Sequence, residues 1–209
     1  MQYKIILSFL LYGFFMLQQA QALDNMLINS VTGLKTWQLS HKNLDLQLVQ
    51  RLPDQTRGFF QGRGFTPQQA NDIATQCVFQ TIAKNTSSKK LVKAITLSLR
   101  TWRIKVSKQD HKQDMSQHNF QKIKLKEDWF TQWQAMSNSR NKVKASAQVA
   151  FKWALFPTEQ TFTSDGDYNW GMISFGLALG SHFDLHIFWK EDQQLYDKWL
   201  YSIECPQDN

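Results

Sequence analysis

The sequence predicts an α+β fold, an antiparallel β-sheet or sandwich with two N-terminal helices and one further short helix. Several segments alternate apolar and polar residues with the period of a strand, and two proline-led helix starts lie in the first third of the chain. No strand–helix–strand alternation and no internal repeat is visible, which disfavours a parallel sheet. The length of 209 residues suits one domain with a substantial core.

Residues 1–22 have the features of a cleavable signal peptide. Lys4 precedes an uninterrupted apolar segment, Ile5–Leu17, and Ala20-Gln21-Ala22 supplies the small side chains that a signal peptidase requires. The apolar segment is about 13 residues long, shorter than the roughly 20 that cross a bilayer. We therefore expect residues 23–209 to form a single exported domain, periplasmic or secreted, with no transmembrane anchor.

The first third of the mature chain predicts a β-hairpin followed by two helices. Residues 36–50 alternate apolar and polar side chains around a polar turn at His41-Lys42-Asn43. Pro53 starts a short helix that ends at nearby glycines. Thr66-Pro67-Gln68-Gln69 is a capping box, and an apolar stripe from Ala70 through Cys77 to Ile82 predicts a second helix that ends near residue 85.

The rest of the chain predicts several strands and one further helix. The helix is placed at residues 127–136, which carry three aromatic side chains, and residues 107–119 are expected to form a polar loop. The predicted strands are residues 91–106 (one long or bent strand), 120–125, 147–155, 183–187 and 199–203, of which the last two form a hairpin.

Cys77 and Cys205 are the two cysteines of the chain, and we expect them to form a disulfide. An even number of cysteines suits an exported protein, whereas a redox or metal-binding thiol pair favours the close C-x-x-C spacing that is absent here. A bond between them closes a loop of about 130 residues, for which chain entropy gives an upper figure of ~4–5 kcal/mol.

Charge is unevenly distributed along the chain. Residues 84–144 hold 15 basic and 4 acidic side chains, whereas residues 158–209 hold 2 basic and 9 acidic ones. A dipolar surface that attracts an acidic partner, an anionic polysaccharide or a membrane face is one interpretation. The other is that the two charge sets meet within the fold. Nucleic acid is not expected as a partner, because no recognised binding motif accompanies the basic charge in this predicted export protein.

The segment Asp165-Gly166-Asp167-Tyr168-Asn169 has the alternating oxygen side chains of a calcium loop. An EF-hand is excluded because Trp170 and Gly176 stand where a glycine and a glutamate are needed, which leaves a looser calcium site or an ordinary Asp-Gly turn. Aromatic side chains beside the turn can present a rigid contact surface to a protein or sugar. We therefore expect a partner-binding loop within residues 162–176, with Asp165, Asp167, Tyr168, Asn169 and Trp170 as its contacts.

Two groups of residues suggest a transition-metal site. His182, Asp184 and His186 share one face of a predicted strand and are typical ligands of zinc, copper or iron, although the same face is expected to meet solvent. His111, Met115 and His118 would share one face of a helix, and a His/Met set suits copper, although the segment also reads as a solvated polar loop. Copper or zinc is thus the alternative to having no cofactor.

Recognisable catalytic signatures are missing from the sequence. It contains no G-x-S-x-G, no H-E-x-x-H and no phosphate-binding glycine loop. We expect a non-enzymatic exported binding or accessory protein of the bacterial cell envelope that contacts another protein or an envelope component. The alternative is a periplasmic metal-handling protein for copper or another transition metal, and the third hypothesis is a hydrolase without a recognisable motif.

Overall fold

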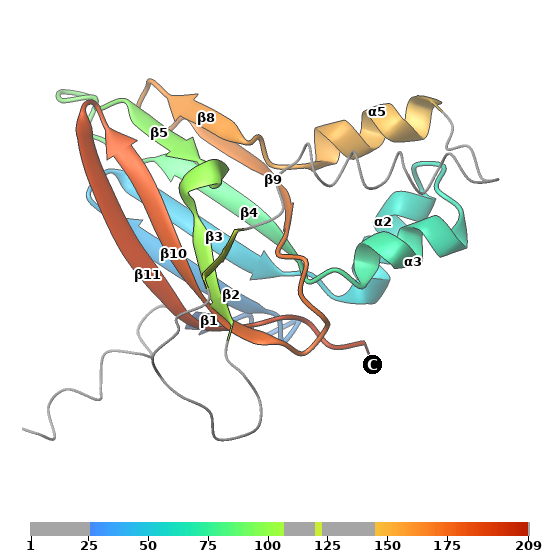
Figure 1. The fold of residues 1–209 in the computed structure, drawn as a ribbon. Helices are drawn as coiled ribbons and strands as arrows, with labels where there is room; N and C mark the ends of the chain where they lie inside the picture. Colours follow the sequence, from blue (N-terminus) through green and yellow to red (C-terminus); the bar gives the residue numbers. More distant parts are fainter. Residues whose placement is uncertain (1–25, 107–119, 123–144, 209) are drawn as a thin grey trace, which may run out of the picture.

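The computed structural model describes residues 26–106, 120–122 and 145–208 and shows an α+β fold built on two antiparallel sheets (Figure 1). The first sheet has the strand order β1-β2-β3-β4-β9. The second has the order β7-β6-β10-β5-β8, with β11 paired to β10. The first sheet comprises β1 (Met26–Ile28), β2 (Lys35–His41), β3 (Leu44–Gln50), β4 (Val78–Asn85) and β9 (Tyr168–Ser174). The second comprises β5 (Ile95–Ser98), β6 (Arg103–Val106), β7 (Phe120–Lys122), β8 (Glu159–Phe162), β10 (His182–Glu191) and β11 (Gln194–Glu204).

The predicted hairpins at both ends of the chain are confirmed. Strands β2 and β3 pair around a turn in which Lys42 has a φ of 53°, and β10 pairs with β11 around Asp192. Alternate side chains of these strands point into one core, as the strand period requires. That core lies between the two sheets and contains the fully buried rings of Trp102, Trp189 and Phe183.

Two helices follow the first hairpin, as predicted, but the second is shorter than its apolar stripe suggested. Helix α2 spans Pro53–Gln61 and α3 spans Pro67–Ala74, whose capping box is formed by Thr66 and Gln69. The chain then leaves the helix, turns at Cys77 with a φ of 53° and continues as strand β4. Strand β4 lies in the middle of the first sheet and pairs with both β3 and β9, so long-range pairing overrides the local helical spacing.

Two strand predictions in the middle of the chain need correction. The segment 91–106 is not one strand, because a 3₁₀ turn at Leu99–Thr101 divides it into β5 and β6, which pair with different parts of β10. Residues 120–122 form β7, and the helix predicted at 127–136 lies outside the described residues. The segment predicted as a strand at 147–155 forms helix α5, Ala145–Ala154.

The correction at α5 has a clear physical basis. Its buried residues are Ala147, Phe151 and Ala154, spaced by four and three positions, which is the spacing of one helix face. Val149 and Trp153, which the alternating pattern would have placed beside Phe151 on a buried strand face, are exposed. Helix α5 packs with α2, α3 and the outer face of the first sheet around a second cluster that includes Phe60, Phe151 and Met172.

The segment predicted as a binding loop at 162–176 is mostly strand. It contains the end of β8, a tight turn and the whole of β9. The carboxylate of Asp167 accepts the backbone N–H groups of Thr163 and Ser164 at 2.8 and 2.7 Å, and Gly166 has a φ of 81°. The Asp-Gly turn is therefore an ordinary turn that holds β8 beside β9, and Tyr168, Asn169 and Trp170 belong to a strand.

The predicted disulfide between Cys77 and Cys205 is present, with a sequence separation of 128. It joins the turn after α3 to the segment that follows β11, so it ties together the two sheets at one end of the sandwich. Neither sulfur is exposed, because both residues are fully buried in the core.

Opposite charges meet inside the described part of the fold. Lys93 pairs with Asp192 at 2.8 Å, and Arg100 lies 4.0 Å from Glu159. Both pairs join the basic segment to the acidic one, because β5 runs between β8 and β10. For these strands the second interpretation of the charge pattern is the one observed. None of the helices among residues 26–106 and 145–208 is long and apolar enough to cross a membrane.

Candidate functional site

The floor of the candidate site is formed where the chain leaves helix α5 and passes along the edge of β9. Leu155 bridges to Met172, and the backbone N–H of Phe156 donates to the carbonyl of Met172 at 3.0 Å. This close approach depends on Gly171, since an added Cβ there would collide with the backbone of Phe156. Because Gly171 has no side chain, the Leu155–Pro157 segment can lie directly against the sheet.

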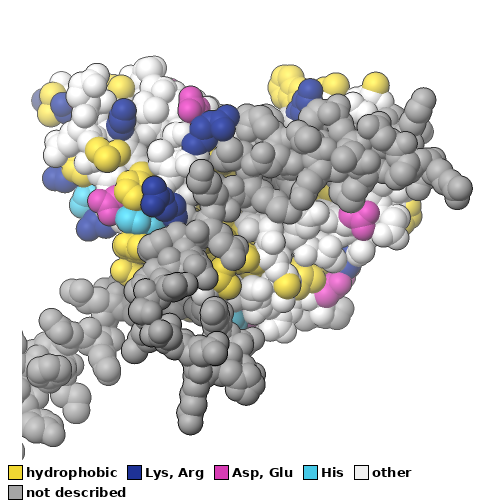
Figure 2. All heavy atoms as spheres, viewed as in Figure 1, with side chains coloured by type: hydrophobic (Ala, Val, Ile, Leu, Met, Phe, Trp, Pro, Cys, Tyr) yellow, Lys and Arg dark blue, Asp and Glu magenta, His cyan; other side chains and the backbone are white. Residues whose placement is uncertain are grey.

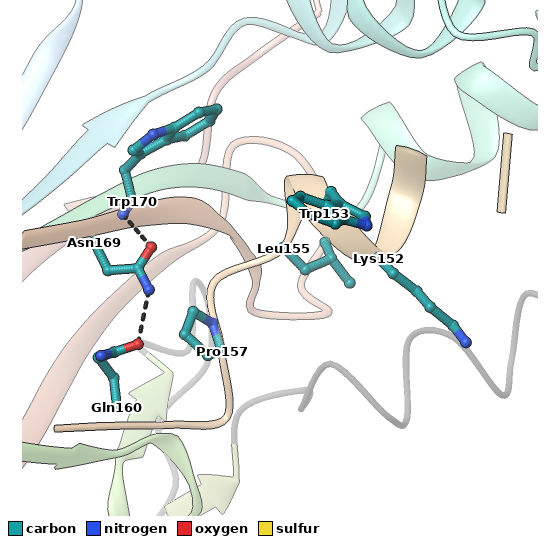
Figure 3. Close-up of a pocket in the computed structure, with 7 residues that line it drawn as sticks. All are labelled: Lys152, Trp153, Leu155, Pro157, Gln160, Asn169 and Trp170. Atoms are coloured by element: carbon teal, nitrogen blue, oxygen red, sulfur yellow. Dashed lines mark hydrogen bonds between the residues drawn. The ribbon is translucent and has the colours of Figure 1, made fainter. Parts of the chain in front are cut away.

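A cleft of about 340 Å³ opens beside this segment, between the last turn of α5, β8 and β9 (Figure 3). The picture shows Leu155 and Pro157 between Trp153 on one side and Trp170, Asn169 and Gln160 on the other. The cleft is lined by Lys152, Trp153, Leu155, Pro157, Gln160, Asn169 and Trp170.

The two tryptophans of the cleft are unusually exposed for their residue type. The exposed fraction is 82% for Trp153 and 47% for Trp170, and Tyr168, two residues before Trp170 on β9, is 67% exposed. Tryptophan is normally highly buried, because its ring removes a large apolar area from water. Within the described residues neither tryptophan packs against another aromatic ring.

The polar side chains of the cleft are held in place by hydrogen bonds. Asn169 donates from Nδ2 to Oε1 of Gln160 at 2.7 Å, and its Oδ1 accepts the backbone N–H of Trp170 at 2.8 Å (Figure 3). Gln160 donates from Nε2 to the carbonyl of Thr161. One N–H of each amide remains for another acceptor.

The lining residues present flat apolar rings, two fixed amides and the ammonium group of Lys152. Among the described lining residues there is no carboxylate, imidazole or thiol, and the groups that they present suit stacking and hydrogen bonding. The arrangement can bind a partner through its rings and orient it through its amides.

The structure divides the predicted contact residues between two roles. It brings Asn169 and Trp170 into the cleft and places Tyr168 beside it. Asp167 serves the β8–β9 turn, and Asp165 lies in the same turn outside the cleft. Sequence reasoning missed Lys152, Trp153 and Gln160, although reading residues 145–154 as a helix would have separated exposed Trp153 from buried Phe151.

Two of the three predicted metal ligands on β10, Asp184 and His186, have other partners, and His182 is partly buried at the first position of the strand. The carboxylate of Asp184 accepts the backbone N–H of Ser202 at 2.9 Å, and Nε2 of His186 lies 2.7 Å from Oδ2 of Asp197. In the part of the chain that the structure describes, no group of three His, Cys, Asp or Glu side chains is placed to hold a metal ion. His111, Met115 and His118 lie outside the described residues.

Comparison with known proteins identifies no relative of this chain. No protein-family model, no curated protein and no solved structure matches the chain.

Proposed function

We propose that this protein is an exported, non-enzymatic binding or accessory protein of the bacterial cell envelope. Its cleft between α5, β8 and β9 contacts another protein or an envelope component. The observation that carries the proposal is the exposure of Trp153 and Trp170 on one cleft, with no ring packed against either among the described residues. Covering such rings with a partner removes their apolar surface from water, at roughly 25 cal/mol per Å² of apolar area.

The fixed amides and the cation add specificity to this surface. The Asn169–Gln160 hydrogen bond orients both amides before a partner arrives, so less conformational entropy is lost on binding. Lys152 adds a positive charge at the rim that favours an acidic or strongly polar partner. Aromatic anchors surrounded by polar groups are typical of binding hot spots.

Export is the second part of the proposal. It is supported by the signal-peptide features of residues 1–22 and by the Cys77–Cys205 disulfide, since disulfides persist mainly in oxidising compartments. The periplasm is the location that we favour. Among the described residues no observation favours the metal-handling or the hydrolase hypothesis over binding.

Affinity capture from an envelope extract of the source organism tests the cleft directly. The bait proteins are the wild type, the double variant W153A/W170A and the control Y201A, which removes a ring that is 46% exposed on β11 in the other sheet. We expect the wild type and Y201A to retain the same component. The double variant should bind it at least about 30-fold more weakly, as for hot-spot residues worth about 2 kcal/mol.

Equal capture by all three proteins would show that the cleft is not the contact surface. Loss of capture in Y201A alone would place the contact surface on β11 instead. Circular dichroism of each variant shows whether the fold is retained, and both cleft tryptophans are exposed enough for their replacement to leave it intact.

A further inference from the structure

Two arginines lie against one phenylalanine ring at the junction of the first sheet and helix α2. The guanidinium of Arg63, just after α2, is 3.4 Å from the ring centroid of Phe59, and that of Arg51, just after β3, is 5.6 Å from it. Arg51 also donates from Nη1 to Oε1 of Gln80 on β4, at 3.3 Å. Four side chains, from helix α2, strand β4 and the two loops on either side of α2, therefore meet at this point.

Arg51 has hydrogen-bonding capacity that the protein does not use. Its Nε atom is buried and has no hydrogen-bond acceptor, and the residue as a whole is partly buried. A guanidinium carries five N–H donors, and among the described residues an acceptor is provided to Nη1 of Arg51 alone. A buried donor without an acceptor destabilises the fold, because it has lost its hydrogen bond to water, so such atoms are rare in native proteins.

The charge at this junction is also uncompensated. In the described chain no carboxylate lies within 4.0 Å of Arg51 or Arg63. The pKa of Arg51 is lowered, first by its burial and then by the positive charge of Arg63. Partly buried arginines are ordinarily paired with an anion, because burial removes their charge from water. A second positive charge nearby adds repulsion, which an anion would also relieve.

We propose that Arg51 and Arg63 form a binding site for an oxyanion, a phosphate or carboxylate group of a small ligand. The planar guanidinium matches the spacing of two oxygens on such a group and binds it through two parallel N–H···O bonds. The anion supplies the acceptor that Nε of Arg51 lacks and neutralises both charges. Because this Nε is buried, binding requires a small rotation of the Arg51 side chain.

The site lies on the same face of the first sheet as Trp170. Gln80 is directly opposite Met172 on β9, and Met172 and Trp170 are two residues apart on that strand. An anionic ligand here therefore occupies the outer face of the sheet, not the core between the sheets. The inference does not depend on the proposed function, because the tryptophan cleft and the arginine site share no residue.

The test is a titration of the folded wild-type protein with inorganic phosphate, and separately with acetate, at constant ionic strength set by chloride. The readout is the NMR signal of the arginine Nε–H groups. We expect saturable shifts of the Arg51 and Arg63 signals with one dissociation constant. In R63Q, the Arg51 signal should saturate at an at least tenfold higher concentration, whereas the control R103Q, an exposed arginine on β6, should match the wild type.

A tighter constant with phosphate than with acetate assigns the site to phosphate groups, and the reverse order assigns it to carboxylates. Shifts that grow linearly without saturation in both titrations, or that are the same in R63Q as in the wild type, overturn the proposal. In that case the two arginines are satisfied by Phe59 and solvent. Titration of W153A/W170A, which should bind phosphate or acetate as the wild type does, separates this outcome from failure of the tryptophan cleft.

Discussion

Among the described residues, exposed aromatic side chains gather in two places, and they are arranged differently in each. On the β10–β11 hairpin, Trp199 stacks on His186 at 4.2 Å between ring centroids and on Tyr201 at 6.1 Å. In the cleft beside β9, Trp153 and Trp170 pack against no other ring among the described residues. Both places hold tryptophans with partly or largely exposed rings.

This difference shows that exposure alone does not identify a binding surface. The rings on β10 and β11 already gain stacking energy within the chain, and His186 is further fixed by Asp197. Their exposure is explained by their place on the outer face of a long hairpin. Among the described residues no ring stacks on the cleft tryptophans, and we propose that a partner outside the chain covers them. Figure 2 shows hydrophobic side chains at the surface on the left and on the right of the face in view.

Both surfaces are expected to belong to one cooperative unit, and removing the disulfide tests this with the largest expected effect. The bond closes a loop of 128 residues, so C77S/C205S should lower the free energy of unfolding by about 4 kcal/mol. Urea unfolding monitored by tryptophan fluorescence and by circular dichroism should still give coincident transitions. Separate transitions would mean that the helices and cleft unfold apart from the hairpin.

Gly171→Ala should disturb the cleft and spare the stacked rings. The new methyl group meets the backbone of Phe156, so the Leu155–Pro157 segment must move, at a cost of about 1–3 kcal/mol in the free energy of unfolding. NMR chemical shifts should change around Asn169 and Trp170 and remain unchanged around Trp199. Gly58→Ala is the matched control, because an added Cβ there meets nothing within 4 Å. A Gly171→Ala protein as stable as Gly58→Ala would contradict the close approach.

Replacing one tryptophan on each surface compares the two directly. Trp199→Ala removes a ring stacked on both sides and should lower the free energy of unfolding by about 1 kcal/mol. Trp153→Ala removes a ring that is 82% exposed and should change it by less than about 0.5 kcal/mol. Urea denaturation of both variants measures the two losses in the free energy of unfolding and shows which is larger. Equal losses would mean that Trp153 is already packed and has no need of a partner.

The smallest effect concerns His41, whose ring lies edge-on to Trp189 and Tyr196. Burial, followed by Lys198 and Lys42, lowers its pKa below 6.5. The unfolded chain therefore takes up the proton first, and stability falls as the pH drops through 6.5 and levels off below the folded-state pKa. In H41F, the loss of stability between pH 7.5 and 5 should be smaller than in the wild type. An unchanged pH dependence would assign the loss to other groups.

The sequence predicted well those elements whose local and long-range requirements agree. The β2–β3 and β10–β11 hairpins pair neighbouring segments, and the proline-led starts of α2 and α3 depend on adjacent residues alone. The disulfide followed from the count of cysteines and the expectation of export. Each of these predictions needed no knowledge of where distant segments lie.

The errors arose where distant segments decide the structure. Residues 78–82 fit a helical stripe, but pairing with both β3 and β9 makes them a central strand. Residues 147–155 alternate like a strand, but the hydrophobic cluster around Phe60 and Phe65 selects the helix face of Ala147 and Phe151. The second of these segments forms one side of the candidate cleft, so the sequence identified only the Asn169 and Trp170 side.

Site-specific photo-crosslinking in the source organism tests the central claim most directly. A photoreactive phenylalanine analogue is placed at position 153 in the cleft and, in a second strain, at position 201 on the β10–β11 hairpin. We predict one dominant adduct from position 153 that disappears when Trp170 is also changed to alanine, and no such adduct from position 201. The same adduct from both positions, or an adduct at 153 that persists without Trp170, would contradict the assignment of the cleft as the contact surface.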